Sequence, residues 1–299
     1  TSNKITKKNL LRGKAIENGF FETLTYVFTN RDNLQKYNFD VVNEKLDILN
    51  PIVNELNTFR STILLNLAEA ASNNAKLGFK KIAFFEIGTV FNKKREESQK
   101  ISFIFSGDKE EENFLNAGKP ENIDFFAFAK KVLNTVGKFE IEAMSEITND
   151  FIHPYQNCNI LINNEIVGYI SKLHPTVANE MGLNDTFIAE IDFDKIQNDL
   201  TKVQSYSKFQ SSRKDISVIA PKSLGFSKIK KVINSIDDQN IKQYNLIDVY
   251  SDEKLADNES LTIRFILQND EKTLEEEDIT STMNKILEEL KEKLGVTLR

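Results

Sequence analysis

The chain has 299 residues, of which 40% are hydrophobic, and a formal net charge of −6. This length can support more than one hydrophobic core, so we expect two domains. The acidic balance argues against bulk attraction to nucleic acid, and the sequence has no apolar run long enough for a membrane helix. One cysteine, Cys158, and two histidines, His153 and His174, exclude an internal disulfide and a zinc site of nitrogen and sulfur ligands. We expect a cytoplasmic protein.

The first 200 residues predict a unit of helices around an antiparallel sheet. In chain order, the pattern predicts an amphipathic segment over 5–17, a β-rich run over 20–28, a turn at Asn50-Pro51, a helix over 64–75, strands over 82–91 and 101–105, and a helix over 125–136 that Gly137 ends. Asn163-Asn164 then predicts a tight hairpin with two positive φ angles, leading into a strand over 166–170. The polar stretch 194–207 is the expected linker.

Residues 205–299 predict the order strand, helix, strand, strand, helix, strand. The expected elements are a strand over 213–220 stopped by Pro221, a helix over 226–236, strands over 241–250 and 260–268, a helix with Thr273 as its N-cap and Gly295 after its end, and a short strand over 296–299. Two helices then share one face of a four-stranded antiparallel sheet, as in a split βαβ unit. The predicted fold class of the whole chain is α+β.

Charge in this second unit is nearly balanced. Residues 205–299 contain 15 Lys and Arg against 17 Asp and Glu, a net charge of −2. The basic residues cluster at the start of the unit, around Arg213, and the acidic ones gather at 270–278 and in the last helix. Consecutive acids at 275–278 splay around a helix, so we expect a solvated first turn there and no metal site.

The second unit resembles the ferredoxin-fold anticodon-binding domain of the beta subunit of bacterial phenylalanyl-tRNA synthetase. Its element order and the residues Asp248-Val249-Tyr250, Ser260 and Arg299 carry the resemblance. The resemblance implies that Tyr250 stacks on an unpaired base, that Asp248 accepts a hydrogen bond from a guanine edge, and that Ser260 and Arg299 complete a polar ring. Together with Arg213, these are the expected RNA-binding residues. Without the resemblance, the favoured interpretation of Tyr250 is an ordinary strand aromatic packed on the sheet.

The first unit resembles the class II synthetase-like core of the same beta subunit. The matching stretches are Asn50-Pro51, Phe59-Arg60-Ser61-Thr62, Phe85-Glu86-Ile87-Gly88, Phe151-Ile152-His153-Pro154 and Leu173-His174-Pro175. Each stretch is weak evidence by itself, whereas their common order and spacing make the combination specific. The resemblance therefore implies a class II synthetase-like antiparallel sheet domain over 1–200 and a ferredoxin-like domain over 205–299.

The residues that grip a nucleotide in active class II enzymes are not found at the matching positions. By the resemblance, the arginine that holds the ATP α-phosphate would follow Val90-Phe91, where this chain has Asn92. No two glycines lie closer than six residues apart, so no phosphate-cradling loop is expected. His153 and His174 each precede a proline and are expected to be turn or structural residues. We expect no catalytic residue and no metal ligand in this chain.

These expectations combine into one hypothesis: a noncatalytic part of a phenylalanyl-tRNA synthetase beta subunit. The first domain would support the catalytic alpha subunit of an α2β2 heterotetramer, and the second would bind the anticodon region of tRNA(Phe). ATP and magnesium would serve the whole enzyme, and this part would hold no cofactor and contact neither membrane nor DNA. The alternatives are an independent class II-like ATP-dependent ligase and a purely structural protein-assembly module.

Overall fold

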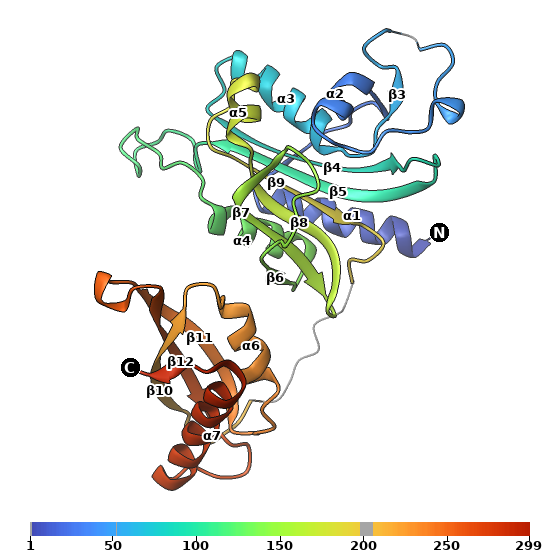
Figure 1. The fold of residues 1–299 in the computed structure, drawn as a ribbon. Coiled ribbons are helices and arrows are strands. Elements are labelled where there is room, and N and C mark those ends of the chain that lie inside the picture. Colours follow the sequence, from blue (N-terminus) through green and yellow to red (C-terminus); the bar gives the residue numbers. More distant parts are fainter. Residues whose placement is uncertain (1, 52, 198–205) are drawn as a thin grey trace. The chain divides into compact units, whose positions relative to one another are not determined.

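The computed structural model describes residues 2–51, 53–197 and 206–299 (Figure 1). The chain divides into two compact units, residues 1–200 and residues 201–299. Residues 198–205 of the expected linker lie outside the described residues. Within the three described ranges, no helix combines the length and the apolar character that crossing a bilayer would need.

A large, mostly antiparallel sheet forms the centre of the first unit. Among the described residues its seven strands run in the order β1-β4-β5-β9-β8-β7-β6. The strands are β1 (Phe21–Glu22), β4 (Lys81–Phe91), β5 (Glu97–Gly107), β6 (Glu140–Glu142), β7 (Ile152–Ile162), β8 (Glu165–Leu173) and β9 (Thr186–Asp192). The pair β1 and β4 is parallel, and the other neighbours are antiparallel. Two short strands, β2 (Phe28–Thr29) and β3 (Thr58–Phe59), pair with each other beside this sheet.

Helices cover both faces of the large sheet (Figure 1). One face carries α1 (Ser2–Glu17) and α4 (Phe125–Val136), and the other carries α2 (Arg31–Lys36), α3 (Leu64–Lys76) and α5 (Pro175–Met181). The central strands β4, β5 and β9 contribute side chains to both cores. A strand buried on both faces is a continuous apolar run, which is why these strands lack an alternating pattern.

The second unit is a small antiparallel sheet with both helices on one face (Figure 1). Within residues 206–299, the four strands β10 (Ser212–Pro221), β11 (Ile241–Tyr250), β12 (Asn258–Leu267) and β13 (Thr297–Leu298) have the order β11-β12-β10-β13. The helices are α6 (Phe226–Asn234) and α7 (Glu276–Leu294). They pack on alternate residues of β10 and β12, namely Ile216, Val218, Ala220, Leu261, Ile263, Phe265 and Leu267.

The residues between these core positions face away from the helices because side chains alternate along a strand. We call this surface the open face. Its members at paired strand positions are Arg213, Asp215, Ser217 and Ile219 of β10, Gln243, Asn245, Asp248 and Tyr250 of β11, and Ser260, Thr262, Arg264 and Ile266 of β12.

The predicted α+β class is confirmed, and so is the order of elements in the second unit. The predicted hairpin is confirmed as well, since Asn163 and Asn164 have φ angles of 52° and 64°. The prediction for Thr273 was wrong, because α7 is capped by Glu275, two residues later. The run 20–28 is only partly strand, with β1 and β2 at its ends, and the strand predicted at 101–105 extends over the whole of β5.

Candidate nucleic-acid interface

Tyr250 and Arg299 meet above Ser260 on the open face. Tyr250 ends β11 at one edge of the small sheet, and Arg299 follows β13 at the other edge, where its backbone N–H donates to the Ser217 carbonyl at 2.9 Å. The two side chains reach toward each other across the intervening strands. The Arg299 guanidinium carbon lies 4.9 Å from the centre of the Tyr250 ring, and its Nη1 donates to Ser260 Oγ at 3.4 Å.

Ser260 is fully buried, although it belongs to the open face, because this pair of side chains covers it. Tyr250 itself keeps 41% of its surface exposed. An aromatic ring exposed on a sheet, beside a planar cation, is a surface on which an unpaired base can stack. The predicted residues Tyr250, Ser260 and Arg299 thus form one cluster.

Asp252, which sequence reasoning missed, fixes the Tyr250 ring at its other end. The Tyr250 hydroxyl donates to Asp252 Oδ2 at 2.9 Å. This hydrogen bond and the carboxylate charge raise the pKa of Tyr250, whereas the same hydrogen bond lowers the pKa of Asp252. At neutral pH the tyrosine is therefore a donor and the aspartate an anionic acceptor. The spacing Tyr-x-Asp after a strand was the available signal, since Asp side chains commonly bond within such turns.

The other two predicted residues occupy different places on the open face. Asp248 is exposed and pairs in register with Thr262, next to the row that contains Tyr250 and Ser260. Arg213 is also exposed, but it pairs with Ile266, six residues along β12 from Ser260. Six residues of strand correspond to about 20 Å. Arg213 is thus on the same surface as Tyr250 but outside the cluster.

In the first unit, Asn92 lies at the exposed end of β4, where it organises a turn. Its Oδ1 accepts hydrogen bonds from the backbone N–H groups of Lys94 and Glu96, both at 2.9 Å. Three residues later, Arg95 has its guanidinium carbon 4.5 Å from the centre of the Phe59 ring and donates through Nη1 to the Leu46 carbonyl at 3.2 Å. Asn92 therefore brings no positive charge to the position after Val90-Phe91, where the resemblance implies an arginine in active class II enzymes. The nearby Arg95 is engaged in holding the loop.

Both histidines are engaged in turns, in agreement with the prediction from their position before proline. His153 Nδ1 accepts from the backbone N–H groups of Tyr155 at 3.1 Å and Gln156 at 3.0 Å. His174 caps α5 by accepting from the Thr176 N–H at 3.3 Å. A ring nitrogen that accepts such bonds is unprotonated and serves the backbone.

Two buried charged groups in the first unit were missed by sequence reasoning. The side chains of Arg60 and Glu86 are 2% and 3% exposed and lie 2.8 Å apart, and Thr25 bonds to both. Burial of this pair is possible because Gly88 has no side chain: a Cβ there would come within 2.2 Å of Arg60 Nη2. The second group is Glu190 of β9, described next.

Glu190 is satisfied by neutral donors. Its carboxylate accepts from Thr62 Oγ1 at 3.0 Å, Ser102 Oγ at 2.7 Å and the Ile63 N–H at 3.0 Å. Because hydrogen bonds saturate these buried charged groups, we assign them to stabilising the fold. The signal that could have found them is a lone acidic residue inside an apolar strand, as in Phe85-Glu86-Ile87.

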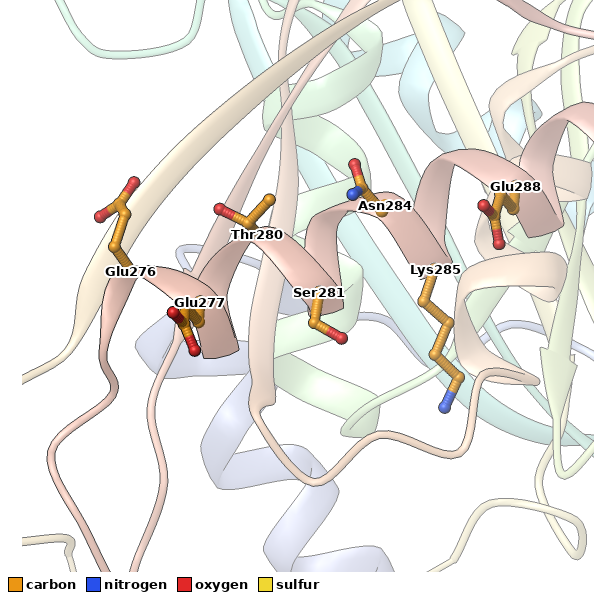
Figure 2. Close-up of a pocket in the computed structure, with 7 residues that line it drawn as sticks. All are labelled: Glu276, Glu277, Thr280, Ser281, Asn284, Lys285 and Glu288. Atoms are coloured by element: carbon orange, nitrogen blue, oxygen red, sulfur yellow. The ribbon is translucent and has the colours of Figure 1, made fainter.

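A shallow polar surface runs along the solvent side of α7 (Figure 2). It is lined by Glu276, Glu277, Thr280, Ser281, Asn284, Lys285 and Glu288, which all belong to one helix. The side chains point outward along the helix rather than converging (Figure 2). In the part of the chain that the structure describes, no group of three or more His, Cys, Asp or Glu side chains is arranged to hold a metal ion.

Comparison with known proteins gives matches over both units. The family model described as the phenylalanyl tRNA synthetase beta chain CLM domain matches residues 1–193, and the model described as the ferredoxin-fold anticodon binding domain matches residues 207–299. The class of protein is therefore an aminoacyl-tRNA synthetase chain that includes a ferredoxin-fold anticodon-binding domain. The chain belongs to the phenylalanyl-tRNA synthetase beta chain family.

Curated relatives support this assignment over almost the whole chain. The phenylalanine–tRNA ligase beta subunit of Sulfurimonas denitrificans is 44% identical over 98% of this chain, and that of Campylobacter jejuni is 39% identical over 97%. The chain spans 38% and 37% of the length of these two relatives. Among solved structures, pyrrolysyl-tRNA synthetase from Desulfitobacterium hafniense aligns with 64% of this chain and 67% of its own, with 15% identity and a TM-score of 0.47.

Proposed function

We propose that this chain works as part of a phenylalanine–tRNA ligase, as a noncatalytic portion of its beta subunit that binds the anticodon region of tRNA(Phe). The observation that carries the proposal is the cluster of Tyr250, Arg299 and Ser260 on the open face. It lies within the residues matched by the anticodon-binding family model. Exposed aromatic rings on sheets are the common platform for single-stranded bases, and the anticodon is single-stranded.

In this proposal residues 1–200 support the catalytic alpha subunit in an α2β2 heterotetramer. Exposed apolar side chains in the edge strand β1 and just after it provide a surface for such contact: Phe21, Leu24 and Tyr26 are 69%, 83% and 71% exposed. ATP and magnesium then serve the whole enzyme in the cytoplasm, at the alpha subunit. The turn role of Asn92 supports this division of labour, because the side chain supplies no charge for a nucleotide.

The test is a titration of the 299-residue chain with tRNA(Phe) at stated salt concentrations. Tyr250→Ala removes the stacking surface and is expected to weaken binding by about 1–3 kcal/mol, roughly five- to 150-fold. Tyr250→Phe keeps the ring and should bind within a few-fold of the original chain.

The matched control is Tyr206→Ala, which removes a tyrosine that is 90% exposed and outside the cluster. Its affinity should equal that of the original chain. Equal affinity of Tyr250→Ala and the original chain would remove Tyr250 from the site. An original chain that binds the alpha subunit but no tRNA would favour the purely structural assembly module instead.

A further inference from the structure

The arginines of the second unit have an unusual placement. Residues 206–299 contain twelve lysines but only three arginines, Arg213, Arg264 and Arg299. All three lie on the open face. Lys214 also pairs in register within the sheet, opposite Phe265 of β12. Its side chain points to the helix side, where its Nζ lies 3.2 Å from Glu276 of α7. Lysine therefore provides the general surface charge of this unit, and arginine is reserved for one surface.

The chemistry of the two residues explains what such a preference selects. A guanidinium is planar, carries five N–H donors and matches the oxygens of a phosphate in a fork, whereas an ammonium is a compact point charge. The near-neutral charge of the unit makes bulk attraction to RNA weak, so contact must come from individual donors. An arginine-lined sheet face is suited to phosphates.

Arg264 is already held in a defined orientation. Its Nε and Nη2 donate to the two carboxylate oxygens of Asp215, both at 2.8 Å, across the pair of strands β10 and β12. Both side chains remain about 40% exposed, at 41% and 39%. The fork with Asp215 uses two of the five N–H donors, and three are left to meet an acceptor arriving from solvent.

Arg264 lies at a distance from Tyr250 that suits a neighbouring nucleotide. Tyr250 pairs with Ser260, and Arg264 is four residues further along β12, which corresponds to about 13 Å. A polar path joins the two positions, because Ser217 and Thr262 share a hydrogen bond of 2.9 Å between their hydroxyls. A base stacked on Tyr250 cannot itself reach Arg264, whereas the backbone that follows it can.

We propose that Arg264, oriented by Asp215, is a second RNA contact that binds a backbone phosphate of the strand whose base stacks on Tyr250. The contact deepens the proposed function and rests on it. Arg213 continues the same line of arginines, since it pairs with Ile266, two residues beyond Arg264 along β12. The strand of RNA would therefore cross the open face along β12, from Arg299 toward Arg213.

The test measures tRNA(Phe) binding by the 299-residue chain over a series of salt concentrations. Arg264→Gln is expected to weaken binding about two- to fivefold and to reduce the slope of log affinity against log salt by about 0.7, the value for one phosphate on a single strand. Arg264→Lys should keep most of the slope and lose affinity, since the charge stays and the fork is lost. Lys214→Gln, which removes a cation from the helix side, is the matched control and should leave both values unchanged.

The outcomes separate this inference from the proposed function. Arg264→Gln with unchanged affinity and slope, beside a weakened Tyr250→Ala, would overturn the phosphate contact alone and leave the Asp215 pair a purely structural cross-strand pair. Unchanged binding by both variants would remove Tyr250 and Arg264 from the site, and no tRNA binding by the original chain would overturn the proposed function. The unfolding of each variant is measured in parallel, so that a loss of tRNA binding can be distinguished from a loss of the folded structure.

Discussion

At the scale of single residues, buried charge in the first unit depends on an absent side chain. Arg60 and Glu86 form an ion pair that is nearly inaccessible to water, and Gly88 leaves the space that the guanidinium fills. Buried pairs are costly to desolvate and are stable only when every remaining donor has an acceptor. Each guanidinium nitrogen of Arg60 has a partner, since Nε donates to the Thr89 carbonyl, Nη1 donates to Thr25 Oγ1 and Nη2 pairs with Glu86.

Gly88→Ala is expected to lower the free energy of unfolding by about 1–3 kcal/mol, because the added methyl group displaces Arg60 from Glu86. Gly13→Ala is the control: Gly13 lies inside α1 with no atom within 4 Å of an added Cβ. This change should instead stabilise by about 0.5–1 kcal/mol, because glycine is a poor helix former. Urea unfolding curves of the two variants and the original chain measure both changes in the free energy of unfolding. Equal stability of Gly88→Ala and the original chain would show that the pair is not held rigidly.

His153 predicts a dependence of stability on pH. Burial, then the charges of Lys172 and His174, lower the pKa of His153 from its ordinary 6.5. The folded state thus binds a proton less readily than the unfolded state. The stability that neutral His153 contributes is complete above pH 6.5 and is lost as the pH falls through that value toward the lowered pKa of the folded state.

A proton on His153 Nδ1 would also displace the two backbone N–H groups, of Tyr155 and Gln156, that donate hydrogen bonds to this nitrogen. His153→Asn keeps an acceptor for the turn and cannot be protonated. We therefore expect a flatter curve of thermal midpoint against pH for His153→Asn than for the original chain between about pH 7 and pH 5. Parallel curves for the two proteins would contradict this account.

At the scale of elements, local turn chemistry was readable from the sequence. The hairpin between β7 and β8 follows from Asn163-Asn164, because asparagine tolerates the left-handed conformation better than other residues with a side chain. The ends of α4 and α7 were readable for the same reason, since Gly137 and Gly295 both have positive φ at the C-cap. Such signals depend on neighbours in the chain and need no tertiary contact.

Asn164→Val is expected to destabilise the first unit by about 1–2 kcal/mol, because a branched side chain in the left-handed region clashes with its own backbone. Asn164→Gly accepts the same φ angle and should remain within a few tenths of a kcal/mol of the original chain. Thermal unfolding of the two variants and the original chain measures these differences in stability. A valine variant as stable as the glycine variant would mean that the turn has rearranged.

Elements whose form depends on burial were harder to predict. The strand β9 lies at the centre of the large sheet and was not predicted, because it is short and buried on both faces and so shows no alternation.

The predicted start of α7 was wrong for a different reason. Thr273 is the better N-cap by residue type, but the helix begins after Glu275, whose backbone N–H donates to Asp278 at 3.1 Å.

At the scale of the whole molecule, the two units divide the proposed work. We expect the 299-residue chain alone to support no phenylalanine-dependent exchange between ATP and pyrophosphate. The reason is that Asn92, at the position where the resemblance implies an arginine for the α-phosphate, carries no charge and its side chain holds a turn. A complete phenylalanine–tRNA ligase provides the positive control. Exchange above background by the isolated chain would favour the independent ligase instead.

The sequence by itself determined the class of fold, the order of elements in the second unit and the resemblance to the beta chain family, because turn residues, hydrophobic period and motif order are properties of neighbours along the chain. Tertiary structure alone decided which side chains meet. Tyr250 and Arg299 belong to opposite edges of one sheet, and they meet because both side chains extend over its open face toward Ser260. Arg264 meets Asp215 because the two residues are directly opposite each other in the paired strands β10 and β12. Arg60 meets Glu86 because folding buries both side chains at the same place in the first unit.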